Sequence, residues 1–199
     1  MNITHVIASI ESRRGGPSRS SVGLAKGLAE LGHDVELLAA DNPPHTEKIE
    51  KLTIHSFGHG FPARFSPSPS MRKHLRNQNF EILHNHGLWL RPLHYVHRQA
   101  RARSVPFVIS PRGMMTTWAW NHHRFQKKLA DRFVHPGALE AATGWHATSE
   151  EEANDIRRLG FRQPICIAPN GIDAPTDQQM QIAGEFWRER VPQLKNRKV

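Results

Sequence analysis

The sequence predicts an α/β fold built on a Rossmann-like, doubly wound parallel sheet. Short apolar segments alternate with helical segments along the whole chain, which is typical of a parallel sheet with helices on both faces. Some of these segments, such as 105–109, are apolar at every position, as expected of strands that are buried on both faces. The length of 199 residues allows one sizeable core.

The first half of the chain provides four expected strands and two expected helices. The strands are 4–10, 35–40, 52–57 and 81–85, and the helices are 18–31 and 70–77. In the first helix Val22, Ala25 and Leu28 share one face, and Gly32 follows where a left-handed cap is needed. A loop rich in Gly, Pro and Ser, 58–70, precedes the second helix.

The second half repeats this rhythm. Strands are expected at 106–110, 144–148 and 164–168, and helices at 91–103, at 122–134, between Ser149 and Gly160, and at 176–190. In the helix 122–134, Phe125, Leu129 and Phe133 recur every four residues. Ser149 and Glu152 have the spacing of a capping box, which predicts the start of the next helix.

Charge and composition indicate which partners and which cellular location to expect. The formal net charge of +9 favours an anionic partner. A membrane surface or a phosphate is favoured over nucleic acid, because no nucleic-acid motif accompanies the charge. No apolar run approaches the roughly 20 residues that span a bilayer, and residues 1–6 do not resemble a signal peptide. With Cys166 as its only cysteine, the protein is expected in the cytoplasm, with peripheral contact at the inner face of the membrane.

In a doubly wound sheet, ligands bind at the carboxyl ends of the strands, so functional residues are expected in the loops there. The first such loop, 11–18, places Gly15 and Gly16 directly before a helix, with Arg13 beside them. Adjacent glycines allow close backbone approach, and a helix N-terminus offers free N–H groups to an anion. The loop lacks the dinucleotide and Walker patterns. On physical grounds alone, a tight strand–helix turn is slightly favoured over a ligand site.

The fourth strand ends with His84 and His86 on one face. Two histidines could bind zinc, but no third ligand stands at a recognisable spacing, so we expect no metal. His86 lies at the strand tip and is expected to contact a ligand, whereas His84 is expected to be a hydrogen-bonded core residue. Trp89 either packs in the core or stacks on a sugar ring; the sequence does not separate these alternatives.

The fifth strand ends in Arg112 followed by Gly113. A guanidinium at this position either holds a phosphate or carboxylate or forms a surface ion pair. The sequence contains no recognisable Ser-His-Asp or Cys-His arrangement and no adjacent carboxylate pair of the kind that glycosidases use. Asn170 and Gly171, after the last strand, predict a turn.

Five segments of the sequence are informative in combination, because of their order and spacing. They are Gly15-Gly16 with the helix ending Leu31-Gly32-His33-Asp34-Val35, then 82–87, 106–113, 146–152 and 169–173. In combination they resemble the retaining glycosyltransferases of family four, which have the GT-B fold. The resemblance implies two Rossmann-like domains that face a cleft. Residues 1–173 would form the N-terminal, acceptor-side domain, and 174–199 the linker and helix leading to a donor-binding domain absent from this sequence.

The resemblance also implies roles for individual residues. Gly15 and Gly16 would meet the donor diphosphate, and His86 matches a histidine of a loop that faces the cleft. A family histidine near the donor sugar corresponds here to Arg112, so its role does not transfer directly, although an arginine can hold donor or acceptor oxygens. We therefore expect Arg112 and His86 to be catalytic. Trp89 and Arg13 are expected to bind the acceptor.

The implied activity is transfer of a sugar, with retention of configuration, from a nucleotide-diphosphate sugar to a polysaccharide or lipid-linked acceptor. No cofactor is expected beyond this co-substrate, and no metal, because helix ends and basic groups can stabilise the leaving diphosphate. The 199 residues alone are expected to have little or no activity. Three alternatives stay open: a non-catalytic half-domain that holds a glycan or a partner, a basic nucleic-acid-binding protein, and another GT-B enzyme such as a sugar-nucleotide epimerase.

Overall fold

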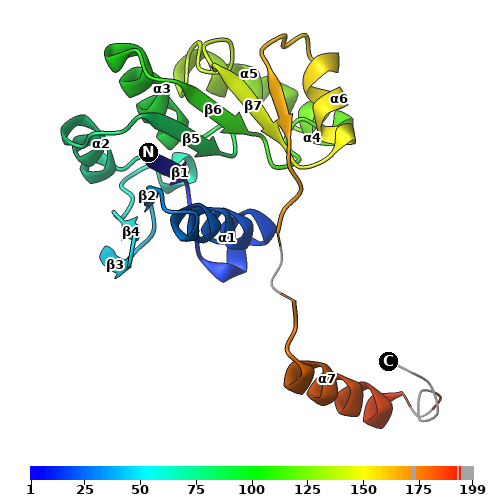
Figure 1. Cartoon of the computed structure of the whole chain (residues 1–199). Coiled ribbons are helices and arrows are strands. Elements are labelled where there is room, and N and C mark those ends of the chain that lie inside the picture. The colour runs from blue at the N-terminus through cyan, green and yellow to red at the C-terminus, as the bar shows by residue number, and fades with distance from the viewer. Residues whose placement is uncertain (172–173, 192, 194–199) are drawn as a thin grey trace.

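The structure, a computed structural model, describes residues 1–171, 174–191 and 193 and is built around one eight-stranded sheet (Figure 1). The strands are β1 (Asn2–Ile7), β2 (Asp34–Ala39), β3 (His45–Ile49), β4 (Leu52–Ser56), β5 (Ile82–His86), β6 (Phe107–Ser110), β7 (Gly144–Ala147) and β8 (Ile165–Ile167). Their order across the sheet is β3-β4-β2-β1-β5-β6-β7-β8. The chain therefore winds outward from β1 in both directions, which confirms the predicted doubly wound α/β class.

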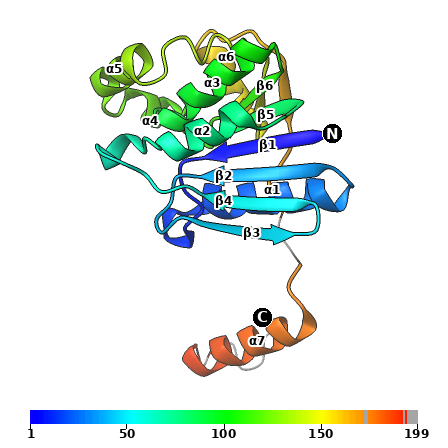
Figure 2. The same cartoon turned by 90° about the vertical axis from the view of Figure 1, so that its left-hand side faces the viewer.

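Seven α-helices accompany the sheet in the part of the chain that the structure describes. They are α1 (Gly16–Glu30), α2 (Pro69–Asn77), α3 (Arg91–Arg103), α4 (Thr117–Asn121), α5 (Arg124–Phe133), α6 (Glu150–Arg158) and α7 (Asp177–Arg190). Figure 2 shows α1 behind the sheet and α2 and α3 in front of it. Side-chain oxygens cap four of the helices, from Ser68, Thr116, Ser149 and Thr176, and supply acceptors for N–H groups that have no partner within the helix.

Alternating side chains of the strands divide the interior into two apolar clusters. On β2, Val35 and Leu37 pack with Ala25 of α1. Leu38 points the other way and packs with Met71 and the rest of the larger cluster, under α2, α3 and α6. This period of two is the geometry of a strand that is buried on both faces, and it decides below which polar side chains share a face.

One strand departs from the parallel arrangement of the predicted sheet. β3 pairs antiparallel with β4 at the sheet edge, and all five of its residues, His45–Ile49, are exposed. Such a strand carries no apolar pattern, which is why it could not be identified from the sequence. The remaining pairs are parallel.

The predicted helix 122–134 is present as α5, which begins two residues later, and the short helix α4 precedes it. His123 has a left-handed backbone, with φ of 54°, and separates α4 from α5. Phe125, Leu129 and Phe133 are 77%, 49% and 64% exposed, so their four-residue spacing marks a surface stripe. The capping box at Ser149 is also only half formed. Ser149 accepts from Glu152 N, but the Glu152 carboxylate binds elsewhere.

The predicted C-terminal helix is present as α7, with a complete capping box between Thr176 and Gln179. Both views show α7 apart from the sheet (Figures 1 and 2). The division into 1–173 and 174–199 stays a prediction, and parts of it, residues 172–173, 192 and 194–199, lie outside the described residues. No described helix has the length and apolar character needed to cross a bilayer.

Candidate functional site

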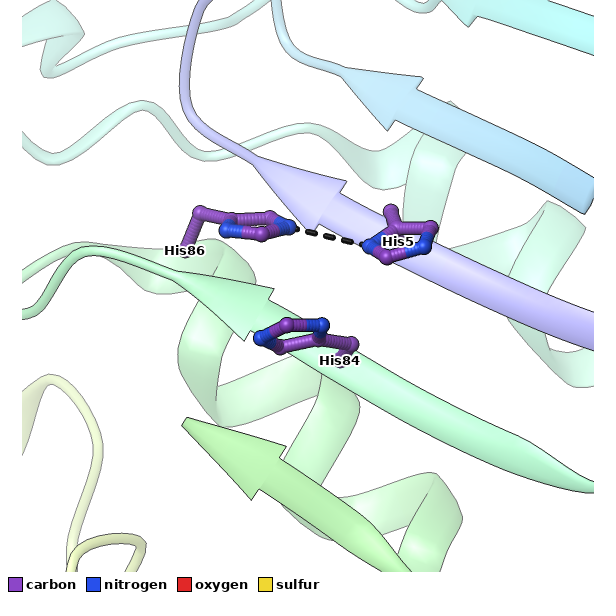
Figure 3. Close-up of side chains that lie close together, drawn as sticks. All are labelled: His5, His84 and His86. Carbon is purple, nitrogen blue, oxygen red and sulfur yellow. Dashed lines mark hydrogen bonds between the residues drawn. The ribbon is translucent and has the colours of Figure 1, made fainter. Parts of the chain in front are cut away.

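The site begins where the chain direction across the sheet reverses, between β1 and β5. Strand register aligns His5 of β1 with His84 of β5, and the period of two places His86 on the same face. Figure 3 shows the three imidazoles gathered at this place. Their ring centroids lie 4.3–5.2 Å apart, and all three side chains are buried. In open α/β sheets this reversal point is where ligands bind.

Arg112 determines how the protons are arranged in this cluster. Its Nη2 lies 3.0 Å from His86 Nδ1, and because a guanidinium can only donate, Nδ1 must accept. The neutral His86 ring therefore carries its proton on Nε2, which donates across 3.0 Å to His5 Nδ1 (Figure 3). His5 in turn keeps its proton on Nε2, a buried atom that finds no hydrogen-bond partner in the described part of the chain.

The rings are neutral because they are buried beside positive charge. Burial, with Arg112 and His146 nearby, lowers the pKa of His5 to about 3. Burial and the neighbouring histidines hold the pKa values of His84 and His86 well below the ordinary range. A charged imidazole would lose its water shell here and face a guanidinium, so near neutral pH these groups act as dipoles with fixed tautomers.

A second hydrogen-bonded chain runs along the same face from β5 to β8. His146 Nε2 donates to the Ala168 carbonyl at 2.9 Å, which leaves His146 Nδ1 to accept from the Ser110 hydroxyl, also at 2.9 Å. Ser110 Oγ then accepts from His84 Nε2 at 2.7 Å. This agrees with the expectation that His84 is a hydrogen-bonded core residue. The ends of four strands are thus joined by polar contacts.

Arg112 itself is held at the tip of β6 with a left-handed backbone, φ 56°. Its Nη1 donates to Asn170 Oδ1 at 2.5 Å, so the guanidinium bridges the loops that follow β6 and β8. Its Nε is buried and has no hydrogen-bond partner among the residues that the structure describes. The partners that the structure describes are an amide and an imidazole, which is not the surface ion pair considered from the sequence.

Glu152 of α6 holds the loop that carries Arg112. One carboxylate oxygen accepts from Gly113 N at 2.6 Å, and the other accepts from Thr148 N at 2.7 Å and Thr148 Oγ1 at 2.9 Å. Glu152 is 6% exposed. The buried carboxylate of Glu152 therefore holds the backbone next to Arg112 against α6 through a hydrogen bond.

The glycine pair lies in the loop after β1, at the start of α1. Gly15 has φ of 94°, a value that favours glycine, whereas Gly16 has no such backbone requirement. A Cβ atom built at either position would meet no described atom within 4 Å. Neither backbone conformation nor packing explains Gly16, so the space above it is open to a ligand.

A pocket of about 470 Å³ lies at the same edge of the sheet. Residues that follow β1, β2 and β5 line it, including Ser9, Asp41 and His86, together with Arg64 from the loop 58–70 and Ser18 of α1. Apolar residues such as Leu88 and Leu93 cover much of its wall. The pocket has the mixed character of a small-molecule site.

The model of Glycosyltransferase Family 4 matches residues 14–175. The chain belongs to this family. The match covers the glycine pair, His84, His86 and Arg112, and it confirms the predicted resemblance.

Solved structures show the same fold for this family 4 chain. Sucrose-phosphate synthase from Thermosynechococcus elongatus is 16% identical, with a TM-score of 0.68 over 92% of this chain and 53% of that one. HepE from Anabaena, solved with UDP-glucose, is 12% identical, with a TM-score of 0.65 over 98% and 51%. UDP-GlcNAc 2-epimerase from Methanocaldococcus jannaschii is 12% identical, with a TM-score of 0.53 over 84% and 45%. No curated protein matches the chain.

The chain therefore spans about half the length of these structures, 53% of the first and 51% of the second. At identities of 16% and below the likeness shows the fold alone. Glycosyltransferase and epimerase structures both share it, so the choice between these activities must come from the site.

The two residues expected to bind the acceptor in this family 4 domain lie outside the pocket. The side chain of Arg13 is 78% exposed and forms an ion pair with Glu11, Nε to Oε2 at 2.7 Å. Trp89 packs against Trp120 and His135, with ring centroids 5.3 and 5.7 Å away, and its Nε1 is buried without a partner. Their acceptor roles stay predictions.

Sequence reasoning missed His5 and Glu152 as parts of the site. His5 sits in an apolar strand with no histidine nearby in sequence, and only the pairing of β1 with β5 brings it to His84. Glu152 was interpreted as a capping residue, because its spacing from Ser149 is that of a capping box. The alternation that placed His84 and His86 on one face would have found His5, had the strand register been known.

His5, His84 and His86 also form a group whose nitrogen atoms could hold a metal ion, so a third histidine is present after all. Ligation through His86 Nε2 would require this nitrogen to lose its proton while Arg112 occupies Nδ1. It would also bring a dication next to the guanidinium. The geometry favours a hydrogen-bonded network here, and the absence of a metal at this place stays a prediction.

Proposed function

We propose that this domain is the acceptor-side half of a transferase that moves a sugar from a nucleotide-diphosphate sugar to a hydroxyl acceptor, with retention of configuration. The observation that carries the proposal is the open space above Gly16 at the N-terminus of α1, at the same sheet edge as Arg112 and His86. The family match supports a nucleotide sugar as donor, as does the similar fold of HepE, whose structure contains UDP-glucose.

The donor diphosphate would lie over Gly15 and Gly16. The first N–H groups of α1 have no partners within the helix and carry the positive end of its dipole. They would stabilise the charge that develops on the leaving diphosphate, without a metal ion or a further cofactor. A side chain at Gly16 would occupy that space.

Arg112 is the group that we propose to contact donor or acceptor oxygens. Its guanidinium is fixed by Asn170 on one side and His86 on the other, so its orientation is determined before substrate arrives. Both ring nitrogens of His86 are occupied, by Arg112 and His5. In this arrangement His86 positions Arg112 and forms part of the pocket wall.

The acceptor would enter the pocket between the loops that follow β1, β2 and β5. We propose a glycan or lipid-linked acceptor, because apolar side chains line the pocket beside the polar Asp41 and Arg64. Arg13 and Trp89 would contact parts of the acceptor outside the pocket.

The surface of α5 supports a peripheral contact with an anionic membrane. Phe125, Leu129 and Phe133 form an exposed apolar stripe. A basic residue stands one position before each of them along the helix: Arg124, Lys128 and Arg132. A basic, apolar helix of this kind binds at the lipid interface. The protein would act at the cytoplasmic face, where lipid-linked acceptors are available.

The test is a transfer assay with a complete protein that contains this domain and with the 199-residue chain alone. Nucleotide release from several nucleotide sugars is measured with glycan and lipid-linked acceptors, and the anomeric configuration of the product is determined by NMR. We expect acceptor-dependent release with retention from the complete protein and none from the chain alone. Inversion, or conversion of the nucleotide sugar without an acceptor, would contradict the proposal, and the latter would indicate an epimerase.

A further inference from the structure

Three side chains with metal-binding groups meet on the face of the sheet opposite α1. They are Glu36 of β2, His55 of β4 and His74 of α2. The register pairs Leu38 with His55, so Glu36, Leu38 and His55 share the face that α2 covers. His5, His84 and His86 point to the opposite face. The two groups are therefore separate sites.

Each carboxylate oxygen of Glu36 faces one histidine nitrogen, at a distance that is long for a hydrogen bond. His74 Nε2 lies 3.4 Å from Glu36 Oε2, and His55 Nε2 lies 3.6 Å from Glu36 Oε1. A good hydrogen bond would be nearer to about 2.9 Å. His74 Nε2 faces Glu36 Oε2, and His55 Nε2 faces Glu36 Oε1. Each of the three residues offers one ligand atom, and these atoms lie within 4.8 Å of one another.

The surroundings orient the rings and leave room for water. Thr46 Oγ1 lies 3.0 Å from His55 Nδ1, the kind of outer contact that metal-binding histidines ordinarily have. The ring of Phe57 packs against both histidines, with centroids 5.5 and 4.9 Å away. The side chains of Glu36, His55 and His74 are 26%, 17% and 16% exposed, so a further ligand can come from solvent.

We propose that Glu36, His55 and His74 bind a divalent transition metal of the zinc type, with water in the fourth position. Two imidazoles and one carboxylate are a zinc ligand set that leaves a position open. The ion would tie α2 to β2 and β4, and through Thr46 to the exposed edge strand β3.

The experiment titrates the chain with Zn²⁺ by calorimetry and with Co²⁺ by visible absorption, and measures Tm with and without Zn²⁺. We expect one ion per chain, a tetrahedral Co²⁺ spectrum and a higher Tm with Zn²⁺. Glu36→Gln and His74→Gln should each weaken binding by at least about tenfold, since each removes one of three protein ligands. His74 is on a surface helix, so His74→Gln keeps the test valid if Glu36→Gln fails to fold.

The chain has 14 histidines, so adventitious binding needs a matched control. His122 and His123 are exposed neighbours whose ring centroids lie 4.0 Å apart, and the double variant His122→Gln, His123→Gln should bind Zn²⁺ like the wild type. Loss of binding in this control would overturn the proposal. Unchanged binding in Glu36→Gln and His74→Gln would show that the ion binds elsewhere and would overturn the proposal. Absence of binding by the wild type would overturn it as well.

Discussion

At the scale of single residues, neither packing nor backbone conformation explains why Gly16 lacks a side chain. A Cβ there meets no described atom within 4 Å, and its φ is outside the left-handed region. We predict that Gly16→Val leaves Tm within a few degrees but raises KM for the nucleotide sugar at least about tenfold, because the methyl groups occupy the diphosphate position. Donor kinetics of a complete protein and a thermal melt measure both effects.

The matched control for this substitution is Gly27, which lies in the same helix and also faces open space. Gly27→Ala should stabilise the domain by roughly 0.5–1 kcal/mol, since a helical glycine is costly in entropy, with no change in KM. Equal kinetic effects of the two substitutions would show that Gly16 acts through the helix and not through the donor.

Glu152 is the second residue for which we predict an effect of substitution, here on both stability and activity. Its carboxylate accepts from Gly113 N and from two groups of Thr148. Glu152→Gln places an amide NH₂ against at least one of these donors, which should lower the free energy of unfolding by about 1–3 kcal/mol. It should also reduce kcat by loosening the loop that carries Arg112. Urea unfolding and transfer kinetics test this prediction, and the exposed Glu150→Gln should change neither by much.

At the scale of elements, the sequence predicted those strands and helices whose signal is local. Caps, turn glycines and apolar runs identified β1, α1, α3 and α6 to within a few residues. β3 was missed, because an exposed edge strand has no apolar pattern. The short helix α4 was missed, because its five residues, Thr117–Asn121, are too few to show a helical pattern. Likewise, His84 and His86 could be placed on one face, but bringing His5 to them requires the pairing of β1 with β5.

α5 is the element whose surface makes a separate prediction. The triple substitution Phe125→Ser, Leu129→Ser, Phe133→Ser should abolish sedimentation with phosphatidylserine vesicles, because it removes the apolar area that would enter the interface. High salt should weaken binding of the unsubstituted chain, since each basic residue contributes about 1 kcal/mol at an anionic surface.

Leu31 provides the control for α5, because it is 76% exposed and lies after α1, away from this stripe. Leu31→Ser should leave vesicle binding unchanged. If the triple variant still sediments with vesicles, the stripe is not the contact with the membrane.

At the scale of the whole molecule, the buried histidines couple stability to pH. The pKa of His5 is lowered to about 3, and those of His94 and His135 to about 4, in each case mainly by burial. Unfolding restores values near about 6.5, so between about pH 6.5 and pH 4 the unfolded chain binds more protons than the folded one. The free energy of unfolding must therefore fall as the pH falls through this window, by up to about 1.4 kcal/mol per pH unit for each such histidine.

Urea unfolding at intervals between pH 7 and pH 4 measures this slope. His5→Gln keeps a polar side chain of similar size but cannot titrate, so its slope should be shallower than that of the wild type by up to about one proton. If the free energy of unfolding of the wild type stays constant down to pH 4, water must reach the rings of His5, His84 and His86. The fixed tautomers that orient Arg112 would then have no basis, and the assignment of Arg112 as the group that meets the substrate would lose its main structural support.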